Sequence, residues 1–195
     1  MGFSAVLLLV ATVPALPARL VSMIPVALVL NIVVGQIIGS VGIPLYLDST
    51  GTVLVAALAG PWAGIATGVL SSLVWSAFNP SVLPFAATSA AVGGLAGVAI
   101  KHGALKNIVT VLLSGAVIGI VVGMLAAPVA AFVYGGTAGV GTGAVVSLLR
   151  EMGHSLLQSV TLQSFISDPL DKALVMLLVW LVLKSLPKRT LAAFR

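Results

Sequence analysis

The sequence predicts an all-α integral membrane protein with about six transmembrane helices, and two observations lead to that prediction. The 195 residues are 60% hydrophobic and only 7% charged, with a mean hydropathy of +1.26. A soluble domain carries about 25% charged residues, so this chain has too few polar side chains to cover a water-exposed surface. At roughly 20 residues per span, the length allows about six spans in one domain, residues 1–195, with no separate soluble domain.

Breaks at Gly, Pro and basic residues divide the chain into apolar segments, each expected to be one helical span. The expected spans are 20–41, 50–60, 62–78, 85–100, 108–133 and 170–186. The second is too short to face lipid on all sides, so we expect it to be buried among the others. The more polar segment 134–168 is expected to form an outer loop and an amphipathic helix before the last span.

The N-terminal stretch from Phe3 to Ala15 is also apolar. No basic residue precedes it, which argues against a signal peptide. We expect it to lead into the first span, and an extra span over residues 3–16 remains an alternative.

The basic residues test this topology, because cytoplasmic loops of membrane proteins carry the excess of Lys and Arg. Six spans place both termini and seven of the nine basic residues on one side, which we expect to be the cytoplasmic side of a prokaryotic plasma membrane. These seven are Arg19, Lys101, Lys106, Lys184, Lys188, Arg189 and Arg195. The four acids, Asp48, Glu151, Asp168 and Asp171, are expected at or near the outer face. Topology therefore accounts for the basic excess, and we expect no nucleic-acid partner.

Several kinds of chemistry are excluded or disfavoured. The chain has no cysteine, and its two histidines, His102 and His154, show no metal-binding spacing. The glycine-rich run 135–141 is not followed by the Lys-Ser/Thr of a phosphate-binding loop. No catalytic set of side chains emerges. The sequence therefore predicts no enzyme, no metal site and no cofactor in this chain, and any ATP would be used by partner ATPase subunits.

Polar side chains at membrane depth are costly, so they usually face a cavity or one another. The candidate substrate-binding residues are Asn31, Gln36, Tyr46, Asp48, Thr52, Trp75, Asn79, His154, Gln158 and Asp171. Structural alternatives stay open for some of them: Asn31 would bond a neighbouring helix, and Asp48 or Ser49 would cap the next helix. Within 142–167, the four-residue spacing of Arg150, His154 and Gln158 predicts one shared helix face.

Two further patterns predict structural roles. Asp168 followed by Pro169 has the form of a cap and first residue of the last helix. Small residues four apart, as at Gly35 and Gly39 or along Gly115, Gly119, Gly123 and Ala127, predict either close helix packing or a face that docks a partner subunit.

Two motifs resemble a known family. Pro44-Leu-Tyr-Leu-Asp48-Ser-Thr-Gly51-Thr52 and Ala59-Gly60-Pro61-Trp62-Ala63-Gly64 look like the substrate-binding membrane subunits, or S components, of energy-coupling factor (ECF) transporters. The start of the last span, Ser167 to Lys172, and the tail from Lys184 to Arg189 are similar as well. The resemblance covers most of the chain.

The resemblance implies a six-helix protein that captures a scarce micronutrient at the outer face. It also implies an ECF transmembrane coupling subunit and two cytoplasmic ABC-type ATPases as partners, docking through small residues of the first helix. For the ligand we expect a B-type vitamin, a precursor, or a modified nucleobase or nucleoside, because the outer half offers amides, hydroxyls and an aromatic ring. The alternatives are a membrane sensor or structural module and a membrane-embedded enzyme.

Overall fold

The computed structural model describes residues 22–136 and 139–187, and every regular element in these ranges is helical. The elements are α3 (Met23–Ser40), α4 (Thr50–Ala59), α5 (Pro61–Ser76), the 3-10 helix η2 (Pro80–Phe85), α6 (Ala86–Lys101), α7 (Ile108–Tyr134), α8 (Val140–Glu151) and α9 (Leu156–Ser185). The expected segment Phe3 to Ala15 lies outside the described residues. Helices α3 to α7 match the first five expected segments to within a few residues.

Within the described residues, three segments are long and apolar enough to cross a membrane: Met23–Ser40, Pro80–Lys101 and Ile108–Tyr134. Their outward side chains are apolar too, as Val26 in α3 (69% exposed) and Leu113 in α7 (62% exposed) illustrate. In water such surfaces would be unfavourable, whereas lipid covers them at no cost. The chain is therefore an all-α protein with the helices of a membrane protein.

Local signals fix the helix ends. Gly60 has a positive φ of 89° that favours glycine, and Pro61 then starts α5, where its missing N–H is not needed. Asn107 caps α7 in a reciprocal pair with Thr110. Gly135 ends the same helix in the left-handed conformation. These turn residues explain why the segment bounds were readable from the sequence.

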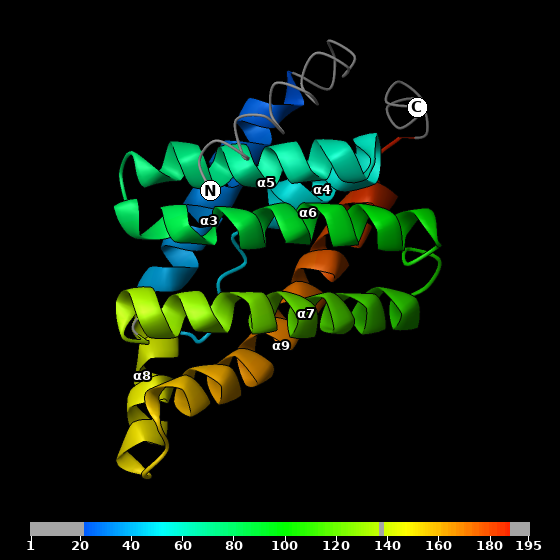
Figure 1. Cartoon of the computed structure of the whole chain (residues 1–195). Helices are drawn as coiled ribbons and strands as arrows, with labels where there is room; N and C mark the ends of the chain where they lie inside the picture. The colour runs from blue at the N-terminus through cyan, green and yellow to red at the C-terminus, as the bar shows by residue number, and fades with distance from the viewer. Residues whose placement is uncertain (1–21, 137–138, 188–195) are drawn as a thin grey trace.

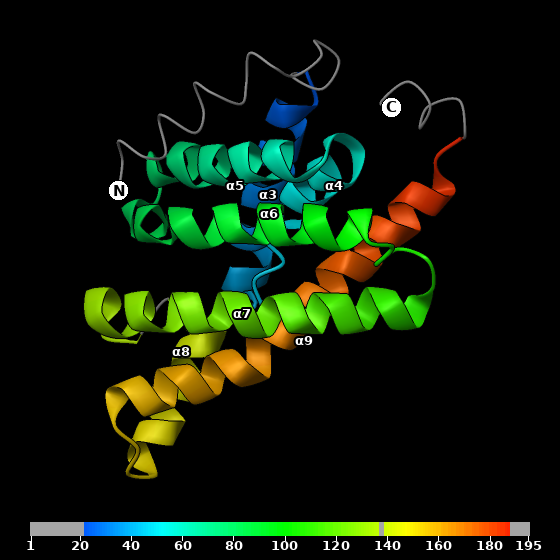
Figure 2. The same ribbon diagram turned by 45° about the vertical axis from the view of Figure 1, so that its right-hand side comes forward.

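The helices form a layer that is crossed from behind. In Figures 1 and 2, α5, α6 and α7 lie side by side, and α9 and α3 run obliquely across them. The short helix α4 contacts α3, α5, α6 and α9, and most of its side chains are buried. The expectation of a short helix buried among others is confirmed.

Glycines allow the closest crossings. A Cβ added at Gly115 of α7 would lie 2.5 Å from Ala173 Cα and 2.6 Å from Lys172 O of α9. A Cβ at Gly64 of α5 would lie 2.7 Å from Gly93 O of α6. Each helix therefore packs against the bare backbone of its neighbour, as small residues permit in membrane bundles. Internal packing, one of the two roles considered for the run from Gly115 to Ala127, is confirmed for its glycines.

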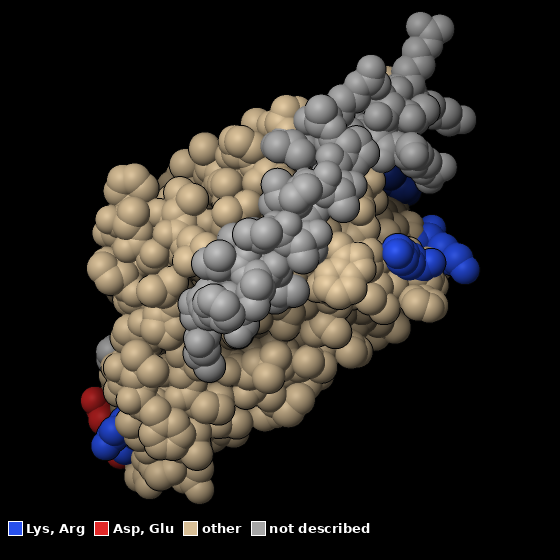
Figure 3. Space-filling view, turned by 45° about the horizontal axis from the view of Figure 1, so that its top comes forward, with Lys and Arg blue, Asp and Glu red and all other residues tan. Residues whose placement is uncertain are grey.

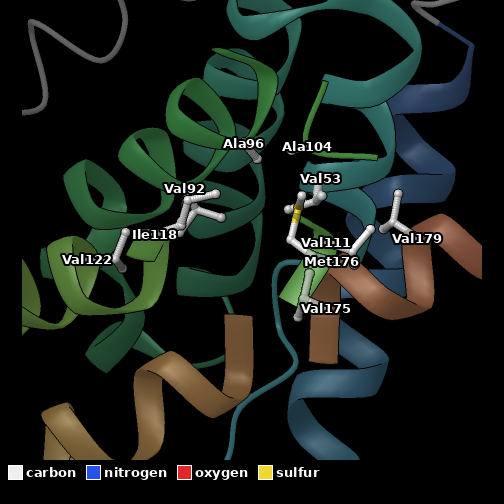
Figure 4. Packing of buried hydrophobic residues seen from close by; sticks show 10 residues of the cluster. All are labelled: Val53, Val92, Ala96, Ala104, Val111, Ile118, Val122, Val175, Met176 and Val179. Carbon is white, nitrogen blue, oxygen red and sulfur yellow. The ribbon is translucent and has the colours of Figure 1, made fainter. Parts of the chain in front are cut away.

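An apolar core fills the space between α4, α6, α7 and α9. Figure 4 shows its buried members: Val53, Val92, Ala96, Ala104, Val111, Ile118, Val122, Val175, Met176 and Val179. Met176 and Val175 belong to the second half of α9, and they are 1% and 0% exposed. The core therefore fixes α9 against the layer, which matters because the first half of that helix lines the site described below.

Surface charges gather at the two ends of the molecule, with an uncharged surface between them (Figure 3). The exposed charged residues of the described part are Lys101, Lys106 and Lys184, together with Arg150 and Glu151 on α8. The remaining charged residues of that part are Asp48, Asp168, Asp171 and Lys172. These were expected at or near the outer face, and the structure places them inside the bundle.

Two local predictions are wrong. The last helix begins at Leu156, not near 170, and Pro169 lies inside it, so Asp168 is not its N-cap. The expected helix over 142–167 is broken between Glu151 and Leu156, where Gly153 has a φ of 95°. Arg150 and His154 therefore do not share a helix face. A capping pair of Ser155 and Gln158 starts α9 instead.

Candidate functional site

Asn31 joins three helices. Its side chain is fully buried, and its amide nitrogen donates to Thr52 Oγ1 at 2.8 Å and to Ser71 Oγ at 3.2 Å. Its amide oxygen accepts from the backbone N–H of Gly51 at 2.7 Å and of Thr52 at 3.3 Å. Both donors and both lone pairs are thus used, so Asn31 satisfies the free N–H groups at the start of α4. The interpretation of Asn31 as a bond to neighbouring helices is confirmed.

Asp171 and Lys172 of α9 hold the segment between α3 and α4. Asp171 Oδ1 accepts from the backbone N–H groups of Tyr46 at 2.8 Å and Leu47 at 2.7 Å. Lys172 Nζ donates to Asp171 Oδ2 at 2.5 Å and Ser49 Oγ at 3.0 Å, and it lies 3.5 Å from Asp48 Oδ1. A buried charge is tolerated only when it is paired and hydrogen-bonded, and Lys172 meets that condition.

These contacts overturn the expected capping of α4. Ser49 occupies the N-cap position of α4, but it forms no side-chain cap bond, and Asp48 lies beside Lys172. Asp48 keeps 35% of its side-chain surface free, and that surface borders the cavity described next.

A cavity of about 420 Å³ lies between the helices, within the range of small-molecule sites. Residues of all seven α-helices from α3 to α9, and of the 3-10 helix, line it. Its polar and aromatic lining comprises Asn31, Gln36, Ser40, Tyr46, Asp48, Ser49, Thr52, Ser71, Ser72, Trp75, Asn79, Ser81, Phe85, Thr88, Ser89, Thr142, Gln163, Ser164, Asp168 and Lys172. A cavity of this size, with convergent polar groups and aromatic rings in its wall, is typical of sites that bind and orient an organic ligand.

Trp75 supplies the aromatic face. Its indole packs so closely on α3 that a Cβ at Gly35 would lie 2.6 Å from Trp75 Cη2 and 2.9 Å from Asp48 Cβ. Gly35 is therefore buried in the site wall, and of its two expected roles the structure shows close packing. Gly39, one turn further on, has no atom within 4 Å of such a Cβ.

The structure brings seven of the ten candidate residues to the cavity: Asn31, Gln36, Tyr46, Asp48, Thr52, Trp75 and Asn79. Asn79 also caps the 3-10 helix by accepting from the backbone N–H of Ser81 at 3.3 Å, and it accepts from the Ser81 hydroxyl at 2.6 Å. The other three are not in its wall. Asp171 lies behind Lys172, fully buried, whereas His154 and Gln158 are exposed at the turn into α9.

Sequence reasoning missed four lining residues on α9: Gln163, Ser164, Asp168 and Lys172. Ser164, Asp168 and Lys172 follow one another at four-residue spacing, which places them on one helix face. This four-residue spacing continues across Pro169, and it was the signal in the sequence that the helix begins before residue 170. Reading Asp168-Pro169 as a helix start concealed it.

Among the residues that the structure describes, no three His, Cys, Asp or Glu side chains come together as a metal site. Comparison of the chain with protein-family models, with curated proteins and with solved structures finds no match in any of the three. The site is therefore interpreted from its own geometry.

Proposed function

We propose that this protein is the substrate-binding membrane subunit of an ECF-type importer, and that the cavity holds its cargo. The observation that carries the proposal is the cavity itself: about 420 Å³, formed between the helices of an apolar all-α protein and lined by an indole, amides, hydroxyls and carboxylates. The resemblance of the Pro44–Thr52 and Ala59–Gly64 segments to S components supports the same function. Both segments lie in or next to helices that form the cavity wall.

The lining favours a small heteroaromatic cargo. A flat ring stacks on Trp75, while hydroxyls and amides around the cavity bond its polar edge. A B-type vitamin, a vitamin precursor, or a modified nucleobase or nucleoside has this form. Such a molecule fits a cavity of this size.

Six spans remain part of the proposal. Besides the three long apolar segments, α4, α5 and the second half of α9 would cross the membrane. Every 18-residue stretch of α9 contains Asp168, Asp171 and Lys172. These three charges are the reason that α9 is not among the three long apolar segments. Asp168 and Lys172 line the cavity and Asp171 is buried behind Lys172, so lipid need not solvate these charges.

The proposed orientation follows from the surface charges. Lys101, Lys106 and Lys184 mark the cytoplasmic end of the bundle in the plasma membrane, and α8 lies at the outer end. Both termini would then be cytoplasmic. The partners are a transmembrane coupling subunit and two cytoplasmic ATPases, and ATP is hydrolysed there and not in this chain.

Docking on the coupling subunit cannot use the stripe of α3 that holds Ala27, Asn31 and Gly35, because all three are buried within the subunit. The exposed apolar residues of the same helix, among them Val29 and Ile37, are free for that contact.

A matched pair of tryptophan variants tests the binding proposal. We expect Trp75→Ala to weaken ligand binding by roughly 10- to 100-fold, because a stacked aromatic contact is lost. Trp62→Ala is the control, since Trp62 is 63% exposed and outside the cavity wall. The readout is the thermal shift of the purified protein across a panel of B vitamins and nucleosides. Equal effects of the two variants on ligand binding would show that the ligand does not bind in the cavity.

A further inference from the structure

Carboxylates outnumber cations around the cavity. Asp48, Asp168 and Lys172 line it, and Asp171 lies directly behind Lys172. Three acids thus share one ammonium group in the interior of a membrane protein. The single lysine is already engaged by Asp171, Ser49 and Asp48, which occupy its three donors. An anionic ligand would have to displace these partners and would face two carboxylates.

Asp168 shares the Lys172 ammonium only at a distance, because that group is bonded to Asp171, Ser49 and Asp48. It is 6% exposed, and it forms no ion pair within 4.0 Å in the ranges 22–136 and 139–187. The Ser164 hydroxyl is its hydrogen-bond partner on the same helix face. Gly123 of α7 leaves room for the carboxylate, since a Cβ there would lie 2.6 Å from Asp168 Oδ2. The carboxylate therefore lies at the cavity wall with a hydroxyl as its hydrogen-bond partner, and with Lys172 acting on it only at a distance.

Gln163 provides an independent indication of a ligand. Its side chain is 4% exposed and lines the cavity, yet its Nε2 has no hydrogen-bond partner in the described part of the chain. A buried amide without a partner is destabilising by about 1–3 kcal/mol, and native proteins keep few of them. Gln163 comes one residue before Ser164, so its amide and the Asp168 carboxylate approach the cavity from one stretch of α9.

We propose that the cargo is a small organic cation that carries a hydrogen-bond acceptor: its positive nitrogen lies at Asp168, and its acceptor takes the free N–H of Gln163. Trp75 lies on the wall contributed by α5 and would stack on the ring, and a cationic ring also gains from the indole face. The inference rests on the proposed binding function and narrows its ligand class to cations.

Three compounds of nearly equal shape test the charge preference: 1-methylnicotinamide (cation), nicotinamide (neutral) and nicotinate (anion). Their affinities for the purified full chain in detergent are measured by titration at one pH and one ionic strength. We expect the cation to bind at least about tenfold more tightly than the anion, with the neutral compound between them. Equal affinities of the three, including no binding by any, would overturn the inference, as would tighter binding of nicotinate.

Two variants assign the preference to residues. Asp168→Asn keeps the shape and removes the charge, and it is expected to bring the cation and the anion to within about threefold of each other. Glu151→Gln is the charge-matched control at an exposed site, and it should leave the ratio unchanged. Gln163→Met should weaken the cation about threefold to tenfold while the charge preference persists. If Asp168→Asn fails to fold, the ratio of cation to anion affinity in the wild-type protein and the effect of Gln163→Met still test the proposal.

Failure of this inference is distinguishable from failure of the proposed function. If the purified protein releases a neutral or anionic compound in stoichiometric amount, the proposed binding function stands and the cationic ligand class is excluded. If the protein binds the cation but supports no uptake with a coupling subunit and ATPases, the proposed cation site stands and the proposed importer function is wrong.

Discussion

Gly115→Ala tests the packing that holds the site together. The added methyl group would lie 2.5 Å from Ala173 Cα, 2.6 Å from Lys172 O and 2.8 Å from Ala173 N. All three atoms belong to the backbone of α9, so no side chain can rotate away. Carbon contacts are optimal near 3.5–4.0 Å, and α7 and α9 must therefore separate by roughly 1 Å.

Two opposing effects set the expected magnitude. Overpacking of this kind costs about 1–3 kcal/mol. Alanine in place of glycine inside a helix recovers about 0.5–1 kcal/mol. The net destabilisation is about 1–2 kcal/mol, which corresponds to a melting temperature lower by roughly 2–8 °C for a domain of this size. Ligand binding should weaken as well, because the affected stretch of α9 includes Lys172.

The assay is thermal unfolding of the purified protein followed by tryptophan fluorescence. Gly39→Ala is the matched control, since a Cβ at Gly39 meets no atom within 4 Å. We expect this control to be neutral or slightly stabilising. If Gly115→Ala proves as stable as Gly39→Ala, the close crossing of α7 and α9 is refuted.

Three further substitutions test the polar contacts of the interior. Asn31→Leu should lower the free energy of unfolding by about 2–4 kcal/mol in denaturant titration, because the Gly51 N–H at the start of α4 loses its acceptor; an unchanged midpoint would contradict the bonding described. Asp171→Leu should be more damaging, by about 3–5 kcal/mol, because it removes a partner of the buried Lys172 ammonium; the same titration measures it, and a loss below 1 kcal/mol would show that the pair is dispensable. His154→Ala should leave both stability and ligand affinity unchanged, since the side chain is exposed; weaker binding would bring the α8–α9 turn into the site.

Local sequence signals located most of the helices. Gly60-Pro61 and Asn107 mark starts that the structure confirms, because a turn residue or cap acts within a few positions of itself. Asp168-Pro169 has the same local form and is a mid-helix pair. A proline inside a helix is tolerated where neighbouring helices surround the freed carbonyl, and a single sequence does not reveal those neighbours.

The candidate site could be predicted in part for the same reason. Tyr46, Asp48 and Trp75 were identified because polar or aromatic groups stand out in an apolar chain. The pairing of Asp48 with Lys172 joins residues 124 positions apart, and no periodicity indicates it. Gln163 and Asp168 were missed because their helix was expected to begin later.

The central claim is that the cavity holds an organic ligand, and mass spectrometry of small molecules released from gently purified protein tests it most directly. The account predicts a stoichiometric heteroaromatic compound from the wild-type protein and from Trp62→Ala, and much less of it from Trp75→Ala. A protein that releases nothing, and that no vitamin or nucleoside stabilises in a thermal-shift panel, would contradict it.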